Sequence, residues 1–107
     1  MKLGLLNTSI MTAPGAYELS DISLDFAKLL VNHYAGNLDS AIGHASTAEI
    51  MSTLLGVEIP VNRQIFEQQP GQDALVFKLN GRPEEGKILT VEEIEKIGYK
   101  FQILRRI

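Results

Sequence analysis

Short apolar runs separated by polar or turn-forming residues predict several β-strands along the chain. Runs of this length are typical of strands that are buried in a sheet. The predicted strands are Lys2–Leu6, Ala16–Leu19, a short strand that ends with Ser40–Ile42, Ala74–Leu79 and Tyr99–Leu104. The segment Val57–Phe66, which contains Pro60, is also expected to be extended.

Three other segments place apolar side chains three or four positions apart, which is the spacing along one face of an α-helix. They are Ser23–Tyr34, Thr47–Leu55 and Thr90–Ile97, each followed within two residues by a glycine. Strands mixed with short helices predict an α/β fold. We therefore expect residues 1–107 to form a single domain, with a mixed β-sheet of about five strands and three short helices.

Polar side chains predict where these helices begin. Ser23 is the expected N-cap of the first helix. Ser46 with Glu49, and Thr90 with Glu93, match the capping box, in which a hydroxyl and a carboxylate satisfy free backbone N–H groups. The second and third helices are therefore expected to start at these pairs.

The first helix has a predicted buried face. Phe26, Leu29, Leu30 and His33 recur at positions i, i+3, i+4 and i+7 of this segment. We expect this face to pack on the sheet, with His33 as a structural or partly exposed residue.

Composition narrows the classes of function. The chain has 107 residues, no cysteine and a net charge of −3. The lack of cysteine excludes disulfides and thiolate metal sites, and it fits a reducing compartment. An acidic balance argues against binding long nucleic acids, because such binding requires the neutralisation of many phosphates. No apolar run is long enough to span a membrane, so a cytoplasmic protein is expected.

The segment Ala41–Thr47, AIGHAST, has the most informative pattern for chemistry. It leads through Gly43 to a helix start, where free N–H groups and the hydroxyls of Ser46 and Thr47 suit a phosphate. His44 lies just before this start, and a histidine beside a phosphate can act as a general acid or base. The alternative is that His44 only precedes the helix and Ser46 only caps it.

Two loops offer further polar groups. Asn7 and Ser9 follow the first strand, at an edge where α/β sheets often bind ligands, although they could form a plain turn. The loop after Ala74–Leu79 carries Arg82, which could bind a phosphate, and Glu85, which could orient Arg82 or a ribose hydroxyl. The alternative for this loop is a solvated turn.

Arg63 lies in an apolar neighbourhood, where it is either free to bind a ligand or paired. With two histidines and no cysteine, a metal site would need carboxylate ligands, and no HExxH motif is present. We expect neither a metal nor a cofactor.

Taken together, AIGHASTAEIMSTLLG, VNRQIF and GRPEEGKILTVEEI resemble the viral ring nucleases, also described as type III anti-CRISPR proteins. The resemblance covers nearly the whole chain, from LLNTSI to the final strand. It implies a homodimer that binds cyclic tetra-adenylate, a defence second messenger, across its two-fold axis. Members occur on archaeal viruses, bacteriophages and integrative elements, so the implied place of action is the cytoplasm, that of the host cell where the protein is virus-encoded.

The resemblance also assigns catalytic roles. The family's catalytic histidine falls on His44, its mobile-loop arginine on Arg82, and the glutamate of that loop on Glu85. The sequence departs from the archaeal viral pattern at Gly81, where glutamine is usual, and at Pro83, where an aliphatic residue is usual.

The implied ligand contacts follow in the same way. The family's Asn-Arg pair falls on Asn62 and Arg63, and the serine of its first loop matches Ser9 when one residue is deleted after Asn7. In the implied reaction, which needs no metal, a ribose 2′-hydroxyl attacks the adjacent phosphorus while the histidine protonates the leaving 5′-oxygen. The products are short linear adenylates that end in a 2′,3′-cyclic phosphate, and their formation switches off type III CRISPR signalling.

Two alternatives remain open. The chain could be a binding protein that sequesters a cyclic oligoadenylate without cutting it, in which case His44 would be dispensable. It could also be a regulatory interaction protein of a mobile element, with no nucleotide ligand.

Overall fold

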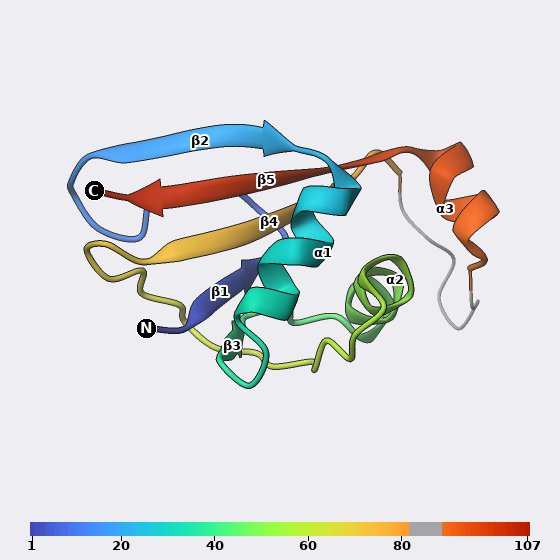
Figure 1. The fold of residues 1–107 in the computed structure, drawn as a ribbon, viewed down its shortest axis with the longest axis horizontal. Helices are drawn as coiled ribbons and strands as arrows, with labels where there is room; N and C mark the ends of the chain where they lie inside the picture. The colour runs from blue at the N-terminus through green and yellow to red at the C-terminus, as the bar shows by residue number, and fades with distance from the viewer. Residues whose placement is uncertain (82–88) are drawn as a thin grey trace.

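The computed structural model describes residues 1–81 and 89–107, and within them it contains one five-stranded sheet and three helices (Figure 1). The strands are β1 (Leu3–Leu6), β2 (Tyr17–Ile22), β3 (Leu38–Ser40), β4 (Asp73–Leu79) and β5 (Tyr99–Arg106). The helices are α1 (Leu24–His33), α2 (Ala45–Leu55) and α3 (Val91–Ile97). The predicted α/β fold is therefore confirmed. In the described residues, no helix has the length and apolar character needed to cross a membrane.

The sheet is mixed, with the strand order β2-β5-β4-β1-β3. β1 is parallel to both of its neighbours, β3 and β4, whereas β5 runs antiparallel to both β4 and β2. In the parallel part, Leu5 lies opposite Ser40 and Leu6 lies opposite Val76. The parallel strands β1, β3 and β4 therefore point toward the same edge of the sheet.

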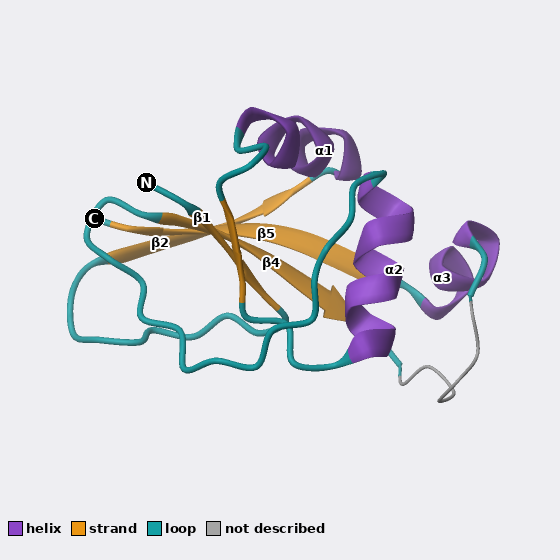
Figure 2. Cartoon of the chain, turned by 90° about the horizontal axis from the view of Figure 1, so that it is seen from below, coloured by secondary structure: helices purple, strands orange, loops and turns teal. Residues whose placement is uncertain are grey.

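The two faces of the sheet are covered in different ways. Figure 2 shows α1 on one side of the sheet and the long connections 7–16 and 57–72 on the other. The main core lies between the sheet and the helices, where apolar side chains from all of them are fully buried. Its largest members are Leu3, Leu5, Ile42, Met51, Leu75, Phe77, Ile94 and Phe101.

A smaller core lies on the opposite face, which we call the loop side of the sheet. It contains Leu6, Ala74, Val76 and Leu104 from the strands, together with Phe66 from the 57–72 connection. Phe66 sits directly over Gly4, because a Cβ atom on Gly4 would lie 2.5 Å from the Cζ atom of its ring. The glycine therefore gives Phe66 room to hold this connection against the sheet.

Two of the predicted helix starts are confirmed. The Ser23 hydroxyl accepts a hydrogen bond from the N–H of Phe26 at 3.1 Å. Thr90 and Glu93 form the expected capping box at the start of α3.

The predicted start of α2 is wrong. The helix begins at Ala45, with His44 in the N-cap position, because the N–H of Ala48 closes the first turn on the carbonyl of His44 at 3.1 Å. Ser46, the predicted cap, and Thr47, the predicted first helical residue, therefore both lie inside the first turn. Similarly, β3 ends at Ser40, where the chain turns toward α2, instead of continuing to Ile42.

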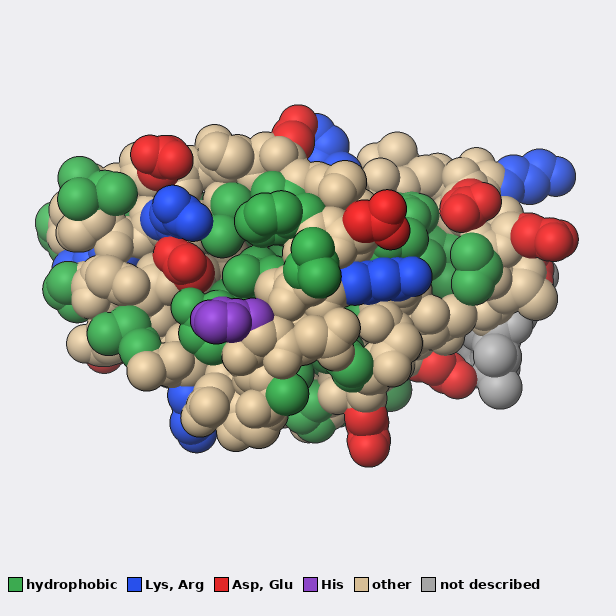
Figure 3. All heavy atoms as spheres, viewed as in Figure 1, with side chains coloured by type: hydrophobic (Ala, Val, Ile, Leu, Met, Phe, Trp, Pro, Cys, Tyr) green, Lys and Arg blue, Asp and Glu red, His purple; other side chains and the backbone are tan. Residues whose placement is uncertain are grey.

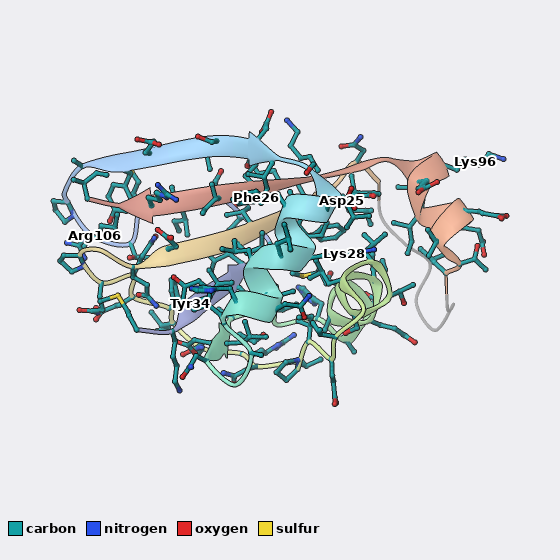
Figure 4. The ribbon with its side chains drawn as sticks, in the orientation of Figure 1. Asp25, Phe26, Lys28, Tyr34, Lys96 and Arg106 are labelled. Atoms are coloured by element: carbon teal, nitrogen blue, oxygen red, sulfur yellow. The ribbon has the colours of Figure 1, made fainter. Side chains whose placement is uncertain are left out.

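The predicted buried face of α1 is confirmed at Leu30, which packs against the main core, but it is wrong at Phe26 and Leu29. The helix packs on the sheet through Ala27 and Val31, while Phe26 and Leu29 are 46% and 69% exposed. Small side chains let the helix approach the sheet closely, and the apolar stripe is wide enough to allow either orientation. Figure 3 shows apolar side chains at the surface on this side of the molecule, and Figure 4 labels Phe26 on α1.

This orientation of α1 gives a direct test by substitution. Val31→Ala should lower the free energy of unfolding by about 2 kcal/mol, because it leaves a cavity in the main core. Leu29→Ala should change it by less than about 0.5 kcal/mol, since that side chain lies in solvent. Urea denaturation measures both values, and a larger loss for Leu29→Ala would restore the face predicted from the sequence.

Candidate functional site

The candidate site lies at the edge of the sheet where the parallel strands end. Chain segments that follow parallel strands in an α/β sheet meet at one edge, where ligands commonly bind. Here the segment 7–9 follows β1, the segment 41–44 follows β3, and Asn80 and Gly81 follow β4. The residues predicted to form the site are therefore brought to one edge from three parts of the sequence.

A stretch of the 57–72 connection is fixed alongside the end of β3. Asn62 donates its backbone N–H to the carbonyl of Ile42 at 2.8 Å and its side-chain amide to the carbonyl of Ser40 at 2.9 Å. The Ser40 hydroxyl in turn donates to the carbonyl of Pro60 at 2.7 Å. Gln64 adds a further hydrogen bond to the Ser40 carbonyl at 2.6 Å. These bonds hold the 60–64 stretch in one position, a structural role for Asn62 that the sequence pattern does not reveal.

This arrangement places Arg63 against Gly43. The Arg63 Nε atom donates to the Gly43 carbonyl at 3.0 Å, and a Cβ atom on Gly43 would lie 3.1 Å from the Arg63 Cγ atom. In the described part of the chain, no carboxylate lies within ion-pair distance of the guanidinium. The Nη groups therefore keep donors for an external acceptor, next to His44.

His44 and the first turn of α2 complete this half of the site. The His44 side chain is exposed and makes no capping hydrogen bond, and the first turn holds no acidic residue. Within the described residues, the hydroxyls of Ser46 and Thr47 have no hydrogen-bond partner. Free N–H groups, free hydroxyls and the positive end of the helix dipole thus lie beside Arg63, an arrangement that favours an anion.

The first loop forms the other half of the site. Asn7 is exposed, whereas Ser9 is half-buried and accepts a hydrogen bond from the Lys78 ammonium group at 2.9 Å. Ser9 also lines a hollow of about 280 Å³ on the loop side of the sheet, whose other walls are Ile10, Met11, Tyr17, Leu19 and Leu104. The sequence does not indicate a role for Lys78, because a single lysine within an apolar strand run matches no motif.

The last two predicted site residues, Arg82 and Glu85, lie outside the described residues. The base of their loop is described. The N–H of Asn80 donates to the carbonyl of Gly98 at 2.8 Å, and Gly81 packs against Ile97 so closely that a Cβ atom would lie 3.2 Å from its Cγ2 atom. The chain therefore leaves β4 from a position fixed at the same edge of the sheet.

The described residues contain no group of three or more histidine, aspartate or glutamate side chains arranged to hold a metal ion. Within the same residues, no hydrogen bond or ion pair connects the His44–Arg63 group with the Ser9–Lys78 pair. The site thus consists of two separate sets of donors at one sheet edge.

Comparison with known proteins identifies the family. The model of the STIV B116-like proteins matches residues 3–101 of this chain. The chain belongs to the STIV B116-like family. The fold agrees, because B116 of Sulfolobus turreted icosahedral virus superimposes with a TM-score of 0.85 at 28% sequence identity, covering 99% of this chain and 100% of that one.

Other STIV B116-like relatives come from a bacterium and a virus. YddF of Bacillus subtilis (strain 168) is 39% identical, over 100% of this chain and 99% of its own length. ORF117 of Acidianus two-tailed virus is 35% identical, over 98% of this chain and 93% of its own length. The resemblance to a family with viral members is therefore confirmed at the level of the family.

The role of Asn62 can be tested without removing its bulk. Asn62→Asp replaces the amide donor that faces the Ser40 carbonyl with an oxygen, so the free energy of unfolding should fall by about 1–2 kcal/mol. Exchange of the Asn62 amide hydrogen, which is bonded to Ile42, should become faster. Asn37→Asp is the matched control, since its side chain has no partner in the described residues. Equal exchange and stability in the two variants would show that the Asn62 side chain does not fix the stretch.

Proposed function

We propose that this STIV B116-like protein is a ring nuclease that cleaves cyclic tetra-adenylate as a homodimer, and that it thereby switches off type III CRISPR signalling. One observation carries the proposal. Arg63, held on the Gly43 carbonyl, lies beside an exposed His44 at an uncapped helix start. A cation and a helix start can bind a phosphodiester, and an exposed histidine can protonate its leaving oxygen. These groups lie on the motifs through which the chain resembles the viral ring nucleases.

The proposed reaction uses these groups in a defined way. The first turn of α2 and the Arg63 guanidinium hold the non-bridging oxygens of one phosphate. The neighbouring ribose 2′-oxygen attacks this phosphorus and loses its proton to solvent, and the bond from phosphorus to the 5′-oxygen breaks. Protonated His44 donates its proton to that departing oxygen. Linear adenylates with 2′,3′-cyclic phosphate ends result, and no metal takes part.

We attribute the rate enhancement of the proposed cleavage to two main effects. A positioned general acid contributes roughly 10²–10⁴-fold. Holding the 2′-oxygen in line with the leaving oxygen contributes more, because it removes the entropic cost of reaching that geometry. Arg82, on which the family's loop arginine falls, would stabilise the charge that develops on the phosphorane, and Glu85 would orient Arg82 or a ribose hydroxyl.

A dimer would match the symmetry of the ligand and supply more positive charge for its phosphates. A ring of four identical nucleotides has rotational symmetry, which matches an isologous two-fold interface. Each chain alone has a net charge of −3, whereas the ligand carries four phosphates. Two copies around one ring would bring twice as many cationic side chains to its phosphates as one copy does.

The position of the site suggests which surfaces meet. Gly43, beside His44, contacts Arg63 of the 57–72 connection, which lies on the loop side of the sheet in Figure 2. The connections there expose several apolar side chains, and Ile65 is 96% exposed. The others are Ile10, Met11 and Val61. We place the dimer contact on these connections, because copies that meet on this side would bring both His44 side chains toward one ring. The proposed place of action is the cytoplasm, that of the host cell where the protein is virus-encoded.

The role of His44 has a direct kinetic test. His44→Ala should bind cyclic tetra-adenylate nearly as tightly as the unchanged protein, while cleavage falls roughly 10²–10⁴-fold, because the proton transfer matters in the transition state. Mass spectrometry of products formed in EDTA measures the rate, and His33→Ala, on the exposed end of α1, is the control. Cleavage by His44→Ala at the unchanged rate would contradict the proposal. A ring left intact by excess unchanged protein would favour a sequestering protein instead.

The dimer contact has its own test. Ile65→Glu should raise the dimer dissociation constant at least about tenfold, because a charge replaces apolar surface that two copies bury. Leu29→Glu, on α1 at the opposite face, should leave it unchanged. Sedimentation equilibrium measures both dissociation constants. A larger increase for Leu29→Glu than for Ile65→Glu would place the dimer contact on the helix side of the sheet.

A further inference from the structure

Lys78 is a cation that no carboxylate in the described residues neutralises. Its ammonium group donates to the Ser9 hydroxyl at 2.9 Å, and both residues are half-buried. In the described part of the chain, no carboxylate lies within ion-pair distance of the Lys78 Nζ atom. The side chain is thus positioned by a neutral partner, with its charge uncompensated.

The neighbouring strand makes this charge more costly. Lys100 on β5 lies directly opposite Lys78 on β4, so the two side chains share the loop side of the sheet. Like charges directly opposite each other in antiparallel strands are destabilising. The charge of Lys100 is offset by Asp21, whose Oδ2 atom lies 3.8 Å from its Nζ atom. Among the described residues, no carboxylate offsets the charge of Lys78.

An anionic ligand would explain this arrangement. We propose that the Lys78 ammonium group binds a phosphate oxygen of the cyclic oligoadenylate, beside the Ser9 hydroxyl. This inference rests on the proposed function and adds a second phosphate-binding position to it, separate from the His44–Arg63 group. Lys78 lies on a strand and is already oriented by Ser9, so its side chain loses little freedom when the phosphate binds. A charge-assisted hydrogen bond of this kind is among the stronger polar contacts.

Binding measurements in the non-cleaving His44→Ala background test the proposal. Lys78→Met should weaken binding of cyclic tetra-adenylate roughly 10–100-fold at low salt, the effect expected for one lost charged hydrogen bond. The loss should shrink in about 0.5 M NaCl, where screening weakens the charge contribution. Lys78→Arg should stay within a few-fold of the parent. Lys100→Met, the matched control on the opposite strand, should bind like the parent.

A second comparison separates ligand binding from support of the loop. If Lys78 only positions Ser9, Lys78→Met should have no further effect once Ser9→Ala has removed the hydroxyl. The proposal predicts a further loss of at least about fivefold in that background. Equal affinities for Lys78→Met and Lys100→Met, or a silent Lys78→Met in the Ser9→Ala background, would overturn it. If the His44→Ala parent and the unchanged protein both fail to bind the ring, the proposed function fails, and the ligand assigned to Lys78 fails with it.

Discussion

The site depends on the hydrogen bonds that fix the 60–64 stretch against the end of β3. The carbonyls of Ser40, Ile42 and Gly43 would otherwise be left without partners at the point where the chain turns into α2. The side-chain amide and backbone N–H of Asn62 satisfy the first two carbonyls, and the Arg63 Nε atom satisfies the third. These bonds place the guanidinium at the start of the helix. Glycine at position 43 permits this close approach, because a Cβ atom there would lie only 3.1 Å from the Arg63 Cγ atom. The same contacts therefore end a strand, position a cation and leave a histidine exposed.

The asymmetry of the sheet has consequences beyond the site. Helices cover one face and bury the main core, while irregular connections cover the other through Phe66 and a few strand residues. These connections also leave apolar side chains such as Ile65 exposed. An oligomer that buries them would complete the fold and at the same time bring two copies of the site together. Binding of one symmetric ring and closure of the second face would then be a single event.

The sequence predicted most of the fold but only part of the site. Strands with strong apolar runs, such as β4 and β5, and helices with clear caps, such as α1 and α3, lie where local pattern places them. The start of α2 was misplaced, because a Ser-x-x-Glu spacing cannot tell a cap from a first turn. The buried face of α1 was misjudged since the choice between Phe26 and Val31 depends on how closely the sheet approaches. Lys78 and the structural role of Asn62 could not be predicted at all, because both arise from contacts with residues far away in the sequence. The roles of Arg82 and Glu85 still rest on the resemblance.

In the proposed reaction, the ligand's own 2′-oxygen attacks the phosphorus and opens the ring while His44 protonates the leaving oxygen. Cleavage of cyclic tetra-adenylate in ¹⁸O-labelled water distinguishes this route from attack by water. If the 2′-oxygen attacks, the linear first products end in a 2′,3′-cyclic phosphate and contain no ¹⁸O, because no water oxygen enters the new phosphate ester. First products that carry ¹⁸O on the terminal phosphate would contradict this route, as would a ring that stays intact with excess protein.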